Sequence, residues 1–247
     1  MRSLCMCLFF LSSVFGNAQD SRKVACRFVC FEGVTPPPPL VNILDRGAEV
    51  VCTIPANELS KEFVCSAKGN LINFLSSEDH KPAASATIPA NVRAAILVFI
   101  PAVKVPSPLP WQIFVIEDTL KNFPDGGAFV ANFYTKDIRF VIGENKIMLP
   151  SGKDHGFARP AQRDAFNMAP VVFQFQQDDT WRTASESLLR FVPGMRYLIF
   201  AYVDAASGRP RISTFEDFIP SAPSPPPASG ARPPRGAAAA GQRNFSC

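Results

Sequence analysis

The sequence lacks the motifs that usually mark an enzyme. It has only two histidines, His80 and His155, and contains no G-x-S-x-G, H-E-x-x-H or P-loop sequence. One loop, Ser151-Gly152-Lys153-Asp154-His155-Gly156, holds several catalytic residue types. A triad is assembled from separate elements, so this run predicts a polar hairpin loop. A hydrolase would require Asp154 and His155 to meet a serine in a pocket. The sequence therefore predicts no catalytic residue and no cofactor.

Cysteine is absent between Cys65 and Cys247, so the second half of the chain needs no disulfide to fold. Cys52 and Cys65 lie on two apolar segments around a turn, where a disulfide is geometrically possible. Cys26 and Cys30 would be about 13 Å apart on one strand and need other partners. Zinc is the alternative, but no C-x-x-C spacing occurs and no histidine is near. We expect a Cys52–Cys65 disulfide and no metal site.

The body of the chain has no excess of either charge. All 21 Asp and Glu lie within residues 19–219, whereas four of the 25 Lys and Arg lie outside it: Arg2, Arg232, Arg235 and Arg243. The body is therefore formally neutral. A nucleic-acid-binding fold carries a basic patch, so we expect no nucleic-acid partner.

Long amphipathic helical patterns are also missing. Short runs rich in Val, Ile, Phe and Thr, separated by Pro, Gly, Asn and Asp, predict strands. The alternation Phe173-Gln174-Phe175-Gln176 is typical of a strand with one solvated face. The pattern predicts an all-β fold of two tandem, mutually similar antiparallel β-sandwiches of the immunoglobulin-like class.

An internal match supports the tandem arrangement. Leu71-Ile72-Asn73-Phe74 aligns with Val172-Phe173-Gln174-Phe175, and Ala84-Ser85 aligns with Ala184-Ser185. Less tightly, 40–54 aligns with 130–142, which places Asn42 on Asn132, and 25–39 aligns with 111–127. The alternative is a chance match, because alternation in strands carries only a period of two.

These features divide the chain into five parts. Residues 1–18 predict a signal peptide, since Met1-Arg2 precedes a short apolar run and small residues at a cleavage site. The apolar run is too short to span a membrane stably. We therefore expect an exported protein, periplasmic or secreted, with no transmembrane segment after cleavage. The other parts are module 1 (19–102), a Pro-rich hinge (103–110), module 2 (111–219) and a disordered tail rich in Pro, Ala and Gly (220–247).

Few residues suggest a binding site. Trp111 follows the prolines, and Trp181-Arg182 follows the Asp178-Asp179 turn. A tryptophan at a loop edge either anchors a partner or stacks on a sugar, or it simply packs over the core edge. Arg93 and Arg196 recur in both copies, so we expect them to support the fold. Acidic pairs at 78–79, 117–118, 178–179 and 216–217 suit a glycosidase or calcium, but also ordinary solvated turns.

The segments NMAPVVFQFQ, WRTASES and GMRYLIFAYVD resemble a family of exported bacterial proteins with tandem β-domains. That resemblance implies the fold and carries no assigned activity. The leading interpretation is a non-enzymatic protein of the cell envelope that acts through binding or assembly, with an envelope protein or a glycan as partner. A carbohydrate-binding module is the second interpretation, and it depends on Trp111 or Trp181 being exposed near polar groups. A hydrolase is the third.

Overall fold

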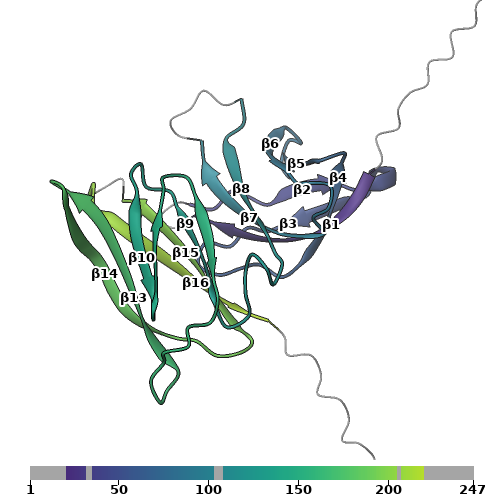
Figure 1. Cartoon of the computed structure of the whole chain (residues 1–247). Coiled ribbons are helices and arrows are strands. Elements are labelled where there is room, and N and C mark those ends of the chain that lie inside the picture. Colours follow the sequence, from purple (N-terminus) through teal and green to yellow (C-terminus); the bar gives the residue numbers. More distant parts are fainter. Residues whose placement is uncertain (1–20, 32–34, 103–107, 205–206, 220–247) are drawn as a thin grey trace, which may run out of the picture.

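The structure is a computed structural model that describes residues 21–31, 35–102, 108–204 and 207–219. Strands make up almost all of its regular structure, together with one short 3-10 turn, η1 (Asp45–Gly47) (Figure 1). The first eight strands, here called the N-terminal half, are β1 (Ser21–Cys30), β2 (Leu40–Ile43), β3 (Glu49–Cys52), β4 (Phe63–Lys68), β5 (Leu71–Ser76), β6 (Pro82–Thr87), β7 (Ala94–Pro101) and β8 (Trp111–Glu117).

The other eight strands form the C-terminal half. They are β9 (Ala128–Asn132), β10 (Ile138–Ile142), β11 (Asn145–Leu149), β12 (Asp154–Phe157), β13 (Met168–Gln177), β14 (Thr180–Arg190), β15 (Met195–Val203) and β16 (Pro210–Phe218). They make two four-stranded sheets, ordered β11-β10-β13-β14 and β12-β9-β15-β16. The first half makes one eight-stranded sheet, ordered β3-β2-β5-β4-β1-β7-β8, with β6 paired to β5.

The strand pairings of the first half recur in the second half, eight strands later. The antiparallel pairs β1·β4, β2·β3, β2·β5, β5·β6 and β7·β8 correspond to β9·β12, β10·β11, β10·β13, β13·β14 and β15·β16. The parallel pair β1·β7 corresponds to β9·β15. One link of the first half has no counterpart: Lys68 pairs with Leu71 and joins β4 to β5. Without that link the first half would also divide into two four-stranded sheets.

The all-β prediction is confirmed, but the sheets are not wholly antiparallel. β1 runs parallel to β7, and β9 runs parallel to β15. Alternation of apolar and polar residues shows which face of a strand is buried, but it does not show the direction of the neighbouring strand. The parallel direction of these two pairs therefore could not be predicted from the sequence.

The strand pairing also changes the first part of the internal match. Residues 111–117, predicted to open the second module, form β8 and pair with β7 from Ala95↔Glu117 to Pro101↔Trp111. By its pairing, β9 is the counterpart of β1. Asn42 lies on β2 and Asn132 ends β9, so their alignment is wrong. The later part of the match agrees with the pairing, because Phe74 and Phe175 lie on the equivalent strands β5 and β13.

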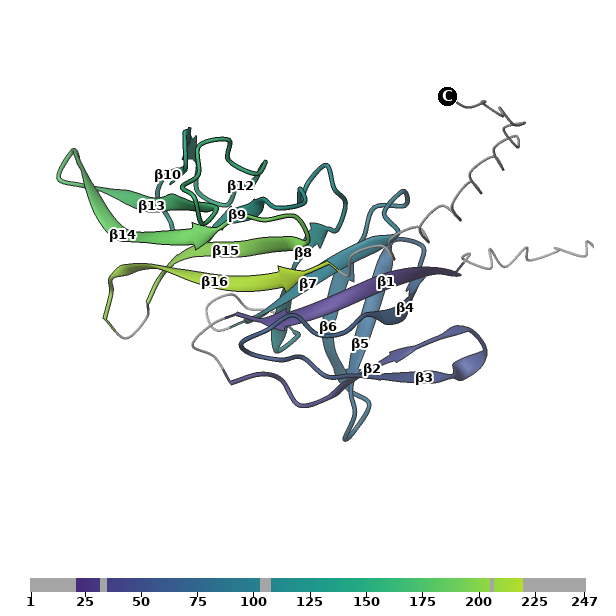
Figure 2. The same ribbon diagram turned by 90° about the horizontal axis from the view of Figure 1, so that it is seen from below.

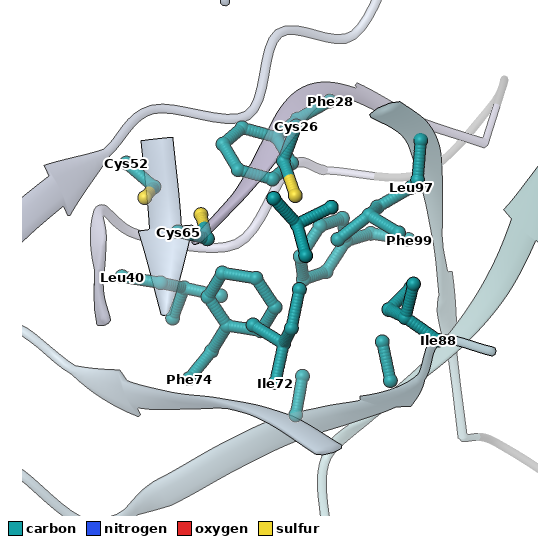
Figure 3. Close-up of a cluster of buried hydrophobic side chains, with 14 of the residues drawn as sticks. Cys26, Phe28, Leu40, Cys52, Cys65, Ile72, Phe74, Ile88, Leu97 and Phe99 are labelled. Atoms are coloured by element: carbon teal, nitrogen blue, oxygen red, sulfur yellow. The ribbon is translucent and has the colours of Figure 1, made fainter. Parts of the chain in front are cut away.

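Each half has its own hydrophobic core. In the N-terminal half, Phe28, Phe74 and Phe99 are fully buried, and their rings meet edge to face (Figure 3). In the C-terminal half, Phe140 and Phe173 stack between the two sheets.

A third cluster joins the halves. Val29, Ile96 and Val98 of the first half are buried against Phe129, Leu198 and Phe200 of the second. These residues lie on β1 and β7 of the first half and on β9 and β15 of the second half. Figure 2 shows the two halves adjoining at these strands. The halves are therefore held together by a continuous apolar interface in addition to the chain that connects them.

Several sequence-based predictions fall outside the described residues: the signal peptide (1–18), the tail (220–247) and residues 103–107 of the proline-rich hinge. Within the part of the chain that the structure describes, no helix is long and apolar enough to cross a membrane.

Candidate functional site

The outer face of the sheet β11-β10-β13-β14 carries the first candidate site. Residues that alternate with the buried ones point away from the core. Phe140 and Phe173 point inward, so Arg139 and Gln174 point outward. Strand register then brings a set of outward residues together, here called the tryptophan face: Arg139, Val141, Lys146, Met148, Pro170, Val172, Gln174, Gln176, Trp181, Thr183, Glu186 and Leu188.

Trp181 is the central feature of this face. It is partly exposed, is not part of any of the three hydrophobic clusters, and sits opposite Gln176. The guanidinium carbon of Arg139 lies 4.3 Å from the centre of its ring. Such a cation–π contact fixes the orientation of both side chains and contributes about 0.5–1 kcal/mol when exposed. Trp181 is thus held in place by another surface residue and not by the core.

A tight turn places Trp181 at the end of a long hairpin. Asp178 and Asp179 have φ values of 49° and 58°, which is the left-handed geometry of a two-residue hairpin turn. Aspartate tolerates that region better than most residues. β13 and β14 are both longer than β5 and β6, their counterparts in the first half. The added length carries the turn to an end of the molecule away from the N-terminal half (Figure 2).

Polar and apolar groups surround the tryptophan. The Gln174 side-chain amide donates a hydrogen bond to the Thr183 hydroxyl at 3.3 Å. Met148 and Leu188 add two large apolar side chains that are 50% and 60% exposed. Trp, Arg and Met are enriched in protein interfaces, and a tryptophan beside amide groups also suits sugar stacking. The face therefore has the chemistry of a recognition surface.

The other sequence-predicted binding residues do not join this face. Trp111 lies on β8, opposite Pro101, and packs against the N-terminal core. Arg182 is exposed but sits opposite Phe175, whose side chain points to the inner side of the sheet. Trp111 and Trp181 are both partly exposed, and Trp181 is the one whose strand register places it beside Gln174, Gln176 and Thr183.

A second candidate is a cleft of about 980 Å³ between the two halves. Two arginines and two aspartates lie on its wall. Arg27 of β1 donates to Asp118 at 2.7 Å and to Asp217 of β16 at 2.5 Å. Arg196 of β15 donates to Asp217 at 2.5 Å and lies 3.1 Å from Asp118. The four side chains thus form a closed ionic network across the two halves.

The electrostatics of this network determine what the cleft can do. Burial acts to raise the pKa of Asp217, but the hydrogen bonds and charges of Arg27 and Arg196 outweigh it and hold the pKa below its usual range. A carboxyl that stays ionised in this way cannot serve as the general acid of a glycosidase. Arg196 also donates to the Phe123 carbonyl and stacks on its ring. The network therefore fastens the halves together.

The cleft has more carboxylates than the network uses. Glu58, Glu62 and Glu216 also line it, are exposed, and take part in no ion pair within the described ranges. Exposed carboxylates of this kind are ordinary on protein surfaces. They do not by themselves define a ligand.

The structure shows where the remaining chemical candidates lie. Ser151 donates to the Tyr134 carbonyl, and the His155 ring lies edge-on to Phe157, with ring centres 5.0 Å apart. No hydrogen bond or ion pair joins Asp154 or His155 to a serine side chain among the residues the structure describes. Arg93 is exposed and Arg196 is buried, so of the recurring arginines Arg196 is the one that holds buried partners. Across the described ranges, no group of three or more His, Cys, Asp or Glu is placed to hold a metal ion.

The sequence did not predict most of the residues that contact Trp181 on the tryptophan face or Asp217 in the ionic network. Arg139 had a signal, because it alternates with apolar residues in the strand that pairs with the Gln174 strand. The ionic network had only a faint one: a Glu-Asp pair lies at or near the end of both β8 and β16, at 117–118 and 216–217. Arg27 and Asp217 are 190 residues apart, and no local pattern links them.

No protein-family model matches this sequence, and a search among curated proteins finds no match.

Proposed function

We propose that this chain is a non-enzymatic, exported binding protein that attaches to a partner in the cell envelope through the tryptophan face. The observation that supports it best is the Arg139–Trp181 stack, which lies outside the hydrophobic clusters on an open sheet face. Burying a tryptophan and an arginine from such a face is a common source of binding energy. A protein partner in an assembly suits the apolar residues Met148 and Leu188 beside the stack.

The two halves also suggest how the fold arose. We infer that the two halves are copies of one immunoglobulin-like sandwich module, and the recurrence of strand pairings supports this. The strand order within each half differs from the immunoglobulin order: the first strand pairs with the fourth and the seventh strands, and the second pairs with the third and the fifth. The long hairpin and Trp181 belong to the second copy only, which makes them better candidates for a specific function than features both copies share.

A glycan is the second candidate partner. It is favoured by the polar groups around Trp181, because Gln174, Gln176 and Thr183 offer amide and hydroxyl groups beside an aromatic ring. Sugar rings are bound by such a combination of stacking and hydrogen bonding.

The W181A variant tests the binding face. A hot-spot tryptophan contributes about 2 kcal/mol or more, so W181A is expected to weaken binding by a factor of about 30 or more. A photo-cross-linking residue at Thr183 in producing cells detects a protein partner, and pull-down on cellulose, chitin and peptidoglycan detects a glycan. L71A is the control, since Leu71 is an exposed apolar residue on β5, in the other half of the chain.

The outcomes separate the candidates. A discrete cross-linked protein that W181A removes and L71A retains supports the protein partner. Retention on a polysaccharide with the same dependence supports the glycan. If W181A matches the unmodified protein in every assay in which that protein binds, the tryptophan face is not the binding surface.

A further inference from the structure

A group of buried thiols in the N-terminal core is unused by the proposed function. Cys26 of β1, Cys52 of β3 and Cys65 of β4 have no solvent exposure and belong to one hydrophobic cluster. All are free thiols in the structure. Figure 3 shows them along one edge of the cluster, with Cys65 between Cys52 and Cys26.

The contacts give Cys65 a special position. Its side chain lies between those of Cys52 and Cys26, and Cys26 is its diagonal neighbour across the β1·β4 pair. Cys65 therefore has two cysteine neighbours, whereas Cys52 and Cys26 lie on opposite sides of it. Cys30, on the same strand as Cys26, is also buried and takes no part in these contacts.

We propose that Cys26, Cys52 and Cys65 form a three-thiol oxidation site in which Cys65 is the common partner of two alternative disulfides. Oxidation joins the Cys65 sulfur to one neighbour and leaves the third as a thiol. With glutathione disulfide as oxidant, two protein thiols become one disulfide, and one glutathione disulfide becomes two glutathione thiols. Both electrons and both protons leave with the glutathione.

Strand register ranks the two disulfides. Val24 is directly opposite Cys65, and Cys26 is directly opposite Phe63, so Cys26 and Cys65 are diagonal neighbours on one face. Diagonal pairs are about 7–8 Å apart, whereas disulfides usually join Cα atoms about 4.4–6.8 Å apart. Cys52 lies on β3, which pairs with β2 and not with β4, so no strand register fixes its distance from Cys65. Cys52–Cys65 is therefore the main product, and Cys26–Cys65 forms when Cys52 is absent.

The two disulfides can interconvert without an added oxidant. The Cys26 thiolate attacks the Cys65 sulfur of a Cys52–Cys65 disulfide, a Cys26–Cys65 bond forms, and Cys52 leaves as a thiolate that takes up a proton. The contact with Cys65 and burial both raise the pKa of the Cys52 thiol, and the contact with Cys26 raises that of Cys65. Thiolates are therefore scarce in the closed core, and the disulfide is formed and exchanged while the core is open, as during folding.

Peptide mapping tests this site directly, because trypsin places the four cysteines of the N-terminal half in four peptides: Cys26 in 24–27, Cys30 in 28–46, Cys52 in 47–61 and Cys65 in 62–68. The full chain is refolded in a glutathione buffer, its free thiols are alkylated, and the linked peptides are identified by mass spectrometry. We expect 47–61 joined to 62–68 in the unmodified chain and in C26A. In C52A we expect 24–27 joined to 62–68. Cys30 serves as the internal control and is alkylated throughout.

Two results would overturn the proposal. One is a free, alkylated Cys65 in the unmodified chain after oxidation. The other is a Cys26–Cys52 disulfide as the main product in C65A. Circular dichroism of each variant reports whether it has folded, and the map of the unmodified chain decides the role of Cys65 even where a variant has not.

Discussion

Replacing Asp217 with asparagine is expected to destabilise the protein by about 3 kcal/mol. Asp217 is only 3% exposed and accepts hydrogen bonds from both Arg27 and Arg196. Asparagine keeps the shape but removes the charge that compensates two largely buried guanidinium groups. Breaking a buried pair from one side is costly because the remaining charge is left without its partner. Urea unfolding, followed by circular dichroism, measures the loss.

The effect of this substitution should also depend on pH. The pKa of Asp217 is lower in the folded protein than the value of about 4 expected for an unfolded chain. Its contribution is therefore fully present above about pH 4 and is lost as the pH falls through the folded pKa. We expect the difference between the unmodified protein and D217N to be largest near neutral pH and to shrink in acid.

The matched control for D217N is E58Q. Glu58 lines the same cleft but is exposed and forms no ion pair within the described ranges. Its substitution is expected to change stability by less than about 0.5 kcal/mol. Equal stability losses in D217N and E58Q would show that the ionic network does not hold the halves together.

The sequence predicted the strands better than it predicted their partners. Runs such as 71–75 and 171–176 lie within β5 and β13, because their alternation shows directly which residues are buried. The pairing of residues 111–117 could not be found in this way. A strand that follows a proline-rich segment has the same alternation whether it begins a new module or joins the previous sheet. The hydrogen bonds between β8 and β7 show that residues 111–117 join the previous sheet.

The candidate sites differ in the same respect. Trp181 was recognised because tryptophan after a tight turn is informative by itself. Arg139 lies 42 residues before Trp181 and meets it only through the pairing of β10 with β13 and β13 with β14. Cys52 and Cys65 were recognised as neighbours across a turn, but the nearness of Cys26 depends on the register of β1 against β4. Short-range patterns thus indicated single residues, and sheet register assembled the groups.

The apolar interface between the halves leads to the second large effect. Phe200 is fully buried there, and its ring contacts those of Phe31, Phe133 and Phe215. Truncating a buried phenylalanine to alanine removes its transfer energy and leaves a cavity. We expect F200A to lower the free energy of unfolding by about 3–5 kcal/mol.

F166A is the control for this substitution, because Phe166 is 76% exposed in the C-terminal half and its truncation leaves no buried cavity. We expect less than about 0.5 kcal/mol from it. Calorimetry distinguishes destabilisation of one half from loss of the interface between the two halves. Since Phe31 and Phe200 come from different halves, the unmodified protein should unfold in one transition, and F200A should lower its midpoint by on the order of 10 °C. Two separate transitions in the unmodified protein, with F200A shifting the later half alone, would show that the halves are independent domains and that the shared cluster contributes little to either.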